Sequence, residues 1–283
     1  MTIRLSITAT LLLVFCISPT FALDPAALVK KAQSLKPETC GNIKSIDQCH
    51  EDYLTGCTAS ERPRYDAYLN FLKNQTPKPT VVPVKTLTRL KEFTELDDHM
   101  PDDLKPGHNA EHAEELAALG QGRIHAVVGF LYLVIVSGAE STNCQLDGEG
   151  ETDYHIHIGF DAAAAKRLRE GWRPTKAETH ELQQTSVIVE MTPHYRKWHQ
   201  PTWSDDALAP LVGRQVKVVG LLLADNEHAK AKDSCAHPNR DKRCWRGSIW
   251  EIHPVTEFYV CGPSGDATCS ATSPEWRKLK DMQ

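Results

Sequence analysis

The segment Ile124–Val136, with the sequence IHAVVGFLYLVIV, decides the fold of this chain. It is almost entirely apolar and rich in β-branched and aromatic side chains, and a single glycine, Gly129, interrupts it. This composition is typical of a strand that is buried in a sheet. A glycine inside a long strand allows the sharp bend that a small closed barrel requires. We therefore predict a long, bent barrel strand here.

Four further segments on the C-terminal side of this strand also have the pattern of strands. They are Asp153–Phe160, Ser186–Thr192, Gln215–Ala224 and Ser248–Cys261. A helix is expected at 162–168, after the second strand. A second, short helix is expected after Ser204, because two aspartates follow this capping residue. Gly220 interrupts the fourth strand as Gly129 interrupts the first.

The order of three strands, a short helix and two strands is that of the OB-fold, a small five-stranded barrel. A β-sandwich would need more strands, and an α/β sheet would need a helix after each strand. We therefore predict an α+β protein in which residues 122–262 form an OB-like five-stranded β-barrel. A small helical, disulfide-containing region precedes the barrel in this prediction.

The rest of the chain divides by composition. Residues 23–74 carry apolar side chains at helical spacing and three cysteines, which predicts a helical Cys-containing region. Residues 75–121 begin with the proline-containing stretch QTPKPTVVPVK, which predicts an extended linker, and end with a helix over 110–119. Residues 263–283 are expected to form a C-terminal tail.

The N-terminus has the features of a secretory signal peptide over residues 1–22. Arg4 supplies a positive charge, a short apolar run follows it, and Thr20 and Ala22 are suited to a cleavage site. The large Phe15 before Cys16 disfavours attachment as a lipoprotein. No later stretch is long and apolar enough to predict a membrane span. We therefore expect a secreted or periplasmic protein.

Eight cysteines remain once the predicted signal peptide is removed: Cys40, Cys49, Cys57, Cys144, Cys235, Cys244, Cys261 and Cys269. An even number in an exported chain predicts up to four disulfides, although their pairing is open. No C-x-x-C pair is present, which disfavours a zinc ribbon or a thioredoxin-like site. Three of the cysteines precede the predicted linker and five follow it. If all eight pair, at least one disulfide must join the two parts.

The overall composition is that of a globular protein. The 283 residues are 41% hydrophobic and 24% charged, with a formal net charge of −5. Nucleic acid is not an expected partner, because the chain has no bulk positive charge. The basic stretch NRDKRCWR over residues 239–246 could bind phosphates. We favour a solvated loop closed by a Cys235–Cys244 disulfide.

Strand alternation separates the polar side chains of the barrel from its core. In the second, third and fifth strands, residues such as Ile156, Val189 and Ile252 suit the core face. The polar residues between them then share the opposite face, which is the usual ligand surface of an OB-fold. These residues are His155, His157, Glu190, Glu251 and His253. His228, beyond the fourth strand, could reach the edge of this patch.

An H-x-H pair on one strand beside E-x-H on a nearby strand suits a metal such as zinc or another divalent cation. The candidate ligands are His155, His157, His253 and His228. Glu190 and Glu251 are candidates for a general base or for carboxylates that orient an imidazole. The alternative is a set of hydrogen-bonded histidines that binds no metal. The H-x-H with E-x-H spacing is similar to that of the zinc ligands of α-type carbonic anhydrases, in spacing only.

The stretch RGSIWEIHPV over residues 246–255 resembles a string, R-G-[ST]-x-W-E-I-H-P-V, found in a family of uncharacterised exported bacterial proteins with an OB-like domain. The resemblance covers roughly residues 120–262. It implies the same domain in this chain and draws attention to Glu251 and His253. It implies no reaction, because the activity of that family is not established.

Three functions fit these observations. The first is an exported barrel that binds a small ligand or a metal through its His/Glu face. The second is a metal-dependent hydrolase, of phosphoesterase or nuclease type, with Glu190 or Glu251 as base. The third is a non-catalytic interaction module whose helical N-terminal region docks a protein partner.

Overall fold

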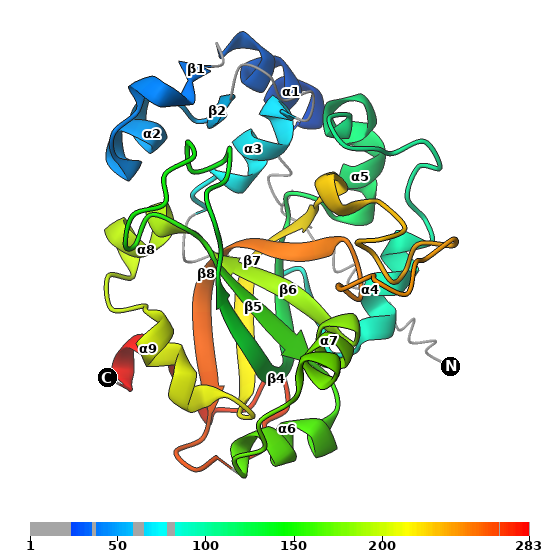
Figure 1. Cartoon of the computed structure of the whole chain (residues 1–283), viewed down its shortest axis with the longest axis vertical. Helices are drawn as coiled ribbons and strands as arrows, with labels where there is room; N and C mark the ends of the chain where they lie inside the picture. Colours follow the sequence, from blue (N-terminus) through cyan, green and yellow to red (C-terminus); the bar gives the residue numbers. More distant parts are fainter. Residues whose placement is uncertain (1–23, 36–37, 59–64, 78–82, 266, 283) are drawn as a thin grey trace, which may run out of the picture.

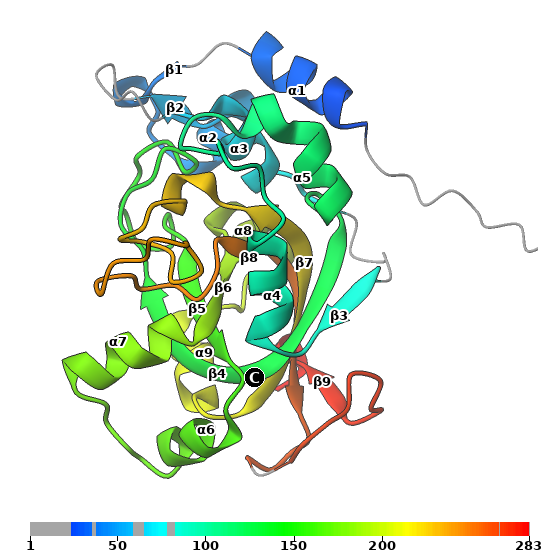
Figure 2. The ribbon, with the colours of Figure 1, turned by 90° about the vertical axis from the view of Figure 1, so that its right-hand side faces the viewer.

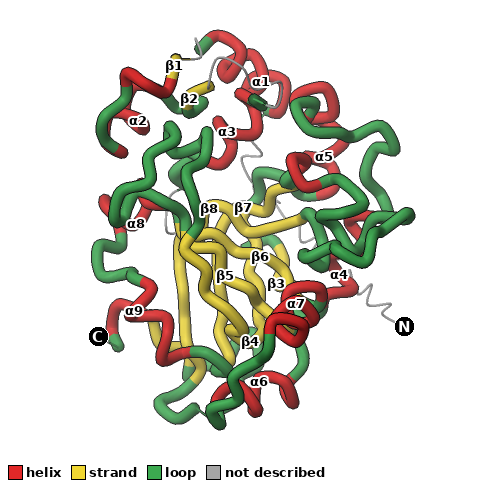
Figure 3. Tube along the Cα trace, viewed as in Figure 1, coloured by secondary structure: helices red, strands yellow, loops and turns green. Residues whose placement is uncertain are grey.

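The computed structural model describes residues 24–35, 38–58, 65–77, 83–265 and 267–282. The predicted signal peptide lies outside the described residues. Within these segments a β-barrel occupies the centre of the molecule and the helices surround it (Figure 3). None of the described helices combines the length and the apolar character that crossing a bilayer requires.

Five strands form the barrel (Figure 1). They are β4 (Ile124–Val136), β5 (Tyr154–Gly159), β6 (Ser186–Met191), β7 (Gln215–Ala224) and β8 (Trp250–Cys261). Their order around the barrel is β4-β5-β6-β8-β7, and β7 pairs again with β4 to close it. Neighbouring strands are antiparallel except β6 and β8, which are parallel. The predicted OB-like barrel is confirmed.

Two glycines allow strands to approach closely where the barrel bends. A Cβ atom on Gly129 would lie 2.6 Å from the carbonyl oxygen of Gly159 on β5. A Cβ atom on Gly220 would lie 2.2 Å from the carbonyl oxygen of Pro254, where the pairing of β7 with β8 shifts register. Any side chain at either position would force the strands apart.

Helices fill the connections between the barrel strands. Between β5 and β6 lie α6 (Ala162–Arg169) and α7 (Lys176–Gln184). Between β6 and β7 lie α8 (Pro193–His199) and α9 (Asp205–Leu208). The Ser204 side chain caps α9 by accepting a hydrogen bond from the N–H of Ala207, as the sequence predicts.

The N-terminal region packs over one end of the barrel, as Figures 1 and 2 show from two directions. Its elements are α1 (Pro25–Ser34), α2 (Ile46–Asp52) and α3 (Ala67–Lys73), with the short strands β1 (Glu38–Thr39) and β2 (Cys57–Thr58). Asn70, in the middle of α3, and Asn74, its C-cap residue, fasten the helix to the loop between β4 and β5. Asn70 accepts a hydrogen bond from Thr142 at 2.8 Å, and Asn74 donates to the carbonyl of Thr142 at 3.2 Å.

Two regions are more ordered than their sequences indicate. Residues 83–121 hold β3 (Lys85–Leu87), which pairs with β4, and the helix α4 (Leu90–Asp97), neither of which was predicted. The helix α5 (Ala113–Leu119) lies within the helix predicted over 110–119. The linker residues 78–82 lie outside the described residues. The predicted C-terminal tail holds β9 (Trp276–Lys278), which pairs with β8. Short 3-10 helices span Cys40–Asn42, Asn109–His112, Ala209–Leu211, Asn226–His228 and Leu279–Asp281.

A large core fills the barrel and follows the predicted alternation. The inward side chains of the second, third and fifth barrel strands are members of this core: Tyr154, Ile156, Ile158, Val187, Val189, Met191, Trp250, Ile252, Phe258 and Val260. The polar residues between them point away from it. The alternation predicted from the sequence is therefore confirmed for all three strands.

Four disulfides use the eight cysteines named above. They join Cys40 to Cys57, Cys49 to Cys144, Cys235 to Cys244 and Cys261 to Cys269. The Cys49–Cys144 disulfide joins α2 to the loop between β4 and β5, which confirms that a disulfide connects the two parts of the chain. The predicted Cys235–Cys244 disulfide is also present.

The Cys49–Cys144 disulfide should contribute more stability than any other of the four cross-links. It closes a loop with a sequence separation of 95, against 8 for Cys261–Cys269. Chain entropy predicts a loss of about 4–5 kcal/mol when both cysteines of the long loop are replaced by serine, and of roughly 2–3 kcal/mol for the short loop. Denaturant unfolding of the two double variants measures this difference. Equal losses would contradict the prediction.

Candidate functional site

Strand register brings the predicted polar residues of the barrel side by side. His155 on β5 lies directly opposite Glu190 on β6. Val189 of β6 pairs with Ile252 of β8, so Glu190 lies beside the flanking residues Glu251 and His253. Side chains of directly opposite residues on one face are in contact range. Glu190 therefore stands between a histidine of β5 and a histidine of β8.

Each carboxylate oxygen of Glu190 faces a different histidine. Its Oε1 lies 3.3 Å from His155 Nε2, and its Oε2 lies 2.7 Å from His253 Nδ1. The row continues on both sides with further carboxylates. Glu140 Oε1 lies 3.2 Å from His155 Nε2, and Glu251 Oε1 lies 3.3 Å from His253 Nδ1. Acidic and imidazole groups thus alternate across three strands.

Two permanent cations, Arg246 and Lys73, neutralise the carboxylate of Glu251 at one end of this row and the nearby Asp225. Arg246 donates to Glu251 Oε2 at 2.6 Å and lies 3.5 Å from Asp225 Oδ2. Lys73, at the end of α3, lies 3.0 Å from the same Asp225 oxygen and 3.6 Å from Glu251. All four side chains are buried. The N-terminal region thus places a positive charge in the barrel's polar face.

The neighbouring charges in this row shift one another's pKa values. Burial lowers the pKa of His155, but Glu190 and Glu140 outweigh burial and raise its pKa to about 9. Burial also lowers the pKa of His253, and Glu190 outweighs it and raises this pKa to about 10. Burial raises the pKa of Glu190, yet the neighbouring cations hold it well below its usual value. Asp153 is different, because burial and the nearby Glu140 raise its pKa to about 7.

A pocket of about 650 Å³ opens above this row of charges. It lies between α3, the loop between β4 and β5, and the loop between β7 and β8. Charged groups of the row form its floor: Lys73, Glu140, His155, Glu190 and Asp225. Aromatic and imidazole side chains on its walls include Tyr65, His228 and Trp245, and the last two rings meet edge to face at 5.1 Å.

The predicted site residues do not form an open ligand surface. His157, Glu190, Glu251 and His253 are buried, and His155 and His228 keep partly exposed side chains. The face that these residues share is therefore largely closed to solvent. The N-terminal region and the loop between β7 and β8 cover that face. Residues 239–243 of this loop are half-buried or exposed, but Arg246 is buried, so the solvated-loop interpretation fails for Arg246.

The predicted histidines do not meet at one point. His157 turns its Nδ1 toward Ser186 Oγ at 2.9 Å. His228 lies on the pocket wall, with its Nε2 3.8 Å from Asp225. Across the described part of the chain, no set of three or more ligand atoms within 4.8 Å of one another contains two histidines. The sets on the barrel are instead Glu140–His155–Glu190, Asp153–Glu190–His253 and Glu190–Asp225–Glu251.

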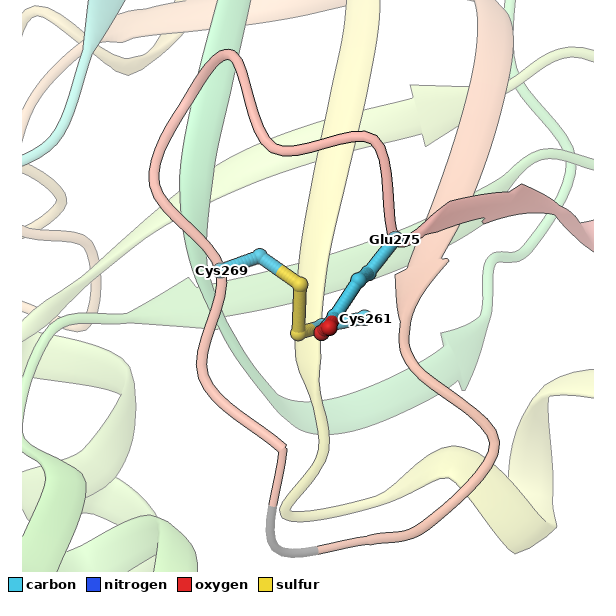
Figure 4. A group of neighbouring side chains, drawn as sticks. All are labelled: Cys261, Cys269 and Glu275. Atoms are coloured by element: carbon cyan, nitrogen blue, oxygen red, sulfur yellow. A yellow bond between two sulfur atoms is a disulfide. The ribbon is translucent and has the colours of Figure 1, made fainter.

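A fourth such set consists of Cys261, Cys269 and Glu275 (Figure 4). The two sulfur atoms are joined in a disulfide, and the Glu275 side chain points toward it. A disulfide offers no thiolate, which is the form of cysteine that binds metals. This set is therefore a cross-link and not a metal site.

Sequence reasoning missed several residues of the site: Lys73, Glu140, Asp153, Asp225 and Arg246. Lys73 ends a helix whose other residues are mostly apolar, and nothing local indicates that its side chain is buried. Glu140 lies in a loop that the Cys49–Cys144 disulfide and hydrogen bonds to α3 and Asp153 hold against the barrel. Strand alternation predicts that Asp153 shares the face of His155 and His157, but Asp153 was not among the predicted ligands.

Comparisons of the chain with family models, with curated proteins and with solved structures find no match. The arrangement of the site is therefore the basis for inferring the function. It combines carboxylates and imidazoles at ligand spacing with a pocket large enough for a small molecule.

The buried pair of Lys73 and Asp225 should couple the N-terminal region to the barrel. Replacing Lys73 by methionine removes one of the two cations that face Asp225 and Glu251, and breaking a buried pair in this way costs about 3–5 kcal/mol. The double variant Lys73→Met, Asp225→Asn should recover part of that loss. Denaturant unfolding of the single and double variants measures the coupling.

Lys197 provides the matched control, because its ion pair with Asp47 is between side chains that are 46% and 38% exposed. Lys197→Met should cost no more than about 1 kcal/mol. Similar losses for Lys73→Met and Lys197→Met would contradict a special role for the buried pair.

Asp97 of α4 should make stability depend on pH. It accepts a hydrogen bond from the N–H of Ile249, at the end of the loop between β7 and β8, and burial raises its pKa to about 7. The folded protein then binds more protons than the unfolded chain between about pH 4 and 7, so stability falls as pH rises through this range. The substitution Asp97→Asn removes the carboxylate and, with it, this dependence.

The stabilisation by Asp97→Asn should be about 2–3 kcal/mol larger at pH 8 than at pH 5, from denaturant unfolding at both values. Asp98→Asn is the control, because Asp98 is the next residue along the chain and is exposed. A stabilisation by Asp97→Asn that is the same at both pH values would contradict the prediction.

Proposed function

We propose that this protein binds a divalent metal at Glu140, His155 and Glu190 and a small ligand in the pocket above it. The spacing of the three ligand atoms is the observation that carries the proposal. His155 Nε2 lies 3.2 Å from Glu140 Oε1 and 3.3 Å from Glu190 Oε1. Zinc bonds of about 2.0–2.2 Å in tetrahedral geometry separate ligand atoms by about 3.3–3.5 Å. An ion therefore fits with little movement of the side chains.

The donor set also suits such an ion. Two carboxylate oxygens and one imidazole nitrogen are ligands of zinc and of manganese. His155 and Glu140 keep 20% and 26% of their side chains exposed, so the remaining coordination positions face the pocket. A small ligand or a water molecule would complete the coordination from that side.

The third hypothesis, a separate docking module in the N-terminal region, has less support. Residues of β2 and α3 line the pocket, and Lys73 reaches the row of charges beneath it. The region therefore acts as one wall of the site. This use of the region favours ligand binding over an independent docking surface.

A hydrolytic role remains the second hypothesis. A metal in an open site lowers the pKa of its bound water and supplies a nucleophile. Glu190 lines the pocket, whereas Glu251 is fully buried and held by Arg246. Of the two carboxylates predicted as base, Glu190 has access to a ligand, and Glu251 is suited to positioning His253.

Export to the periplasm or outside the cell is part of the proposal. The predicted signal peptide supports it, and so do the four disulfides, because such bonds persist in oxidising compartments. The resemblance of residues 246–255 to a string of exported bacterial proteins points the same way and stays a prediction.

Metal binding tests the proposal directly. The mature protein, made in an oxidising compartment without a polyhistidine tag and stripped with a chelator, is titrated with Zn²⁺ in a calorimeter. The wild type should bind Zn²⁺, and Glu140→Gln and His155→Asn should each weaken binding at least about tenfold, because each removes a ligand. The loss of even an outer-shell partner commonly costs about 10–100-fold.

His99→Asn is the matched control, because His99 is an exposed histidine just beyond α4. Its affinity for Zn²⁺ should equal that of the wild type. A wild type that binds no metal, or one whose affinity is unchanged by Glu140→Gln and His155→Asn, would overturn the proposal.

A further inference from the structure

A second set of ligand atoms lies on the other side of Glu190. It consists of Asp153, Glu190 and His253, whose ligand atoms lie within 4.8 Å of one another. All three residues are buried, and Glu190 Oε2 lies 2.7 Å from His253 Nδ1. The oxygen that faces His155 is the other one. A single carboxylate thus belongs to two sets, one at the pocket and one behind it.

Residues of the second set carry buried atoms that have no partner. Asp153 accepts a hydrogen bond from Asn143 through Oδ2, at 2.7 Å. Its Oδ1 is buried, and within the described part of the chain no hydrogen-bond partner reaches it. The same is true of His253 Nε2, whereas His253 Nδ1 and Glu190 Oε2 are paired with each other at 2.7 Å. Buried polar atoms almost always have a partner, so an unpartnered carboxylate oxygen and an unpartnered imidazole nitrogen in one set indicate a bound group.

The permanent cations nearby, Lys73 and Arg246, form ion pairs with carboxylates outside the second set. Lys73 lies 3.0 Å from Asp225, and Arg246 donates to Glu251 at 2.6 Å. Neither forms an ion pair with Asp153 among the described residues. The third set on the barrel, Glu190–Asp225–Glu251, is therefore already neutralised, whereas the Asp153 carboxylate has no permanent cation of its own in the described part of the chain.

We propose that Asp153 and His253 bind a second divalent cation, with Glu190 as the bridging ligand between the two metals. This inference rests on the proposed function, because Glu190 is shared with the first site. Carboxylate-bridged pairs of metals lie about 3.5–4 Å apart. The two oxygens of one carboxylate, each directed at a different histidine, are arranged for such a pair. Oxygen and imidazole ligands suit Mn²⁺ and Zn²⁺ in both positions.

The number of bound ions and their magnetic coupling test the inference. The metal-free mature protein is equilibrated with Mn²⁺, bound manganese is measured by elemental analysis, and the electron paramagnetic resonance spectrum is recorded. The wild type should bind two ions per chain, with a spectrum broadened by exchange through the bridge. Asp153→Asn should bind one ion and show an uncoupled six-line spectrum.

Matched variants separate the two sites. Glu140→Gln should also reduce binding to one ion, and Glu190→Gln should weaken both. His253→Gln tests the second site independently if Asp153→Asn fails to fold, as judged by circular dichroism. Asp147→Asn, at an exposed aspartate in the same loop between β4 and β5, should keep two coupled ions.

The outcomes distinguish the two proposals. One uncoupled ion per wild-type chain at saturating Mn²⁺, lost in Glu140→Gln, overturns the second site and supports the first. Two ions that remain coupled in both Asp153→Asn and His253→Gln also overturn the second site. A wild type that binds neither Mn²⁺ nor Zn²⁺ overturns both proposals.

Discussion

The buried carboxylate of Glu190 is the constraint on which the rest of the structure depends. It lies at the centre of three barrel strands and is 2% exposed. Burying an ionised carboxylate away from water destabilises the folded state by several kcal/mol, unless opposite charges and hydrogen bonds offset that cost. The offsetting groups come from distant parts of the sequence: His155 from β5, His253 from β8 and Lys73 from α3. Groups from both the N-terminal region and the barrel therefore keep this carboxylate ionised.

The barrel itself follows from local patterns in the sequence. Alternation along a strand decides which side chains face the core, and this rule needs no knowledge of distant contacts. It assigned Ile156, Val189 and Ile252 to the core and His155 and His253 to the other face, as the structure has them. The position of the helices and glycines then distinguished an OB-like barrel from other folds of five strands. Each of these features could be predicted because it depends on a few consecutive residues.

What covers the polar face could not be predicted in the same way. Lys73 and Arg246 belong to segments whose local pattern is that of an ordinary helix and a charged loop. Their burial depends on the carboxylates of Asp225 and Glu251, which lie on other elements of the fold. Alternation says which side of a strand a residue occupies, but not whether another segment packs on that side. The polar residues therefore share the predicted side of their strands, but that side is covered by other segments of the chain.

The cross-links explain how loops can form a site of this kind. Glu140 and the residues around it lie in a loop that Cys49–Cys144 fastens to α2. Arg246 and Trp245 follow directly on Cys244, whose disulfide to Cys235 closes the second loop. A loop that contributes a ligand or a buried charge loses conformational freedom when it is ordered, and this cost falls when a covalent bond already restricts it. The two disulfides therefore hold the loops that close the pocket over Glu190.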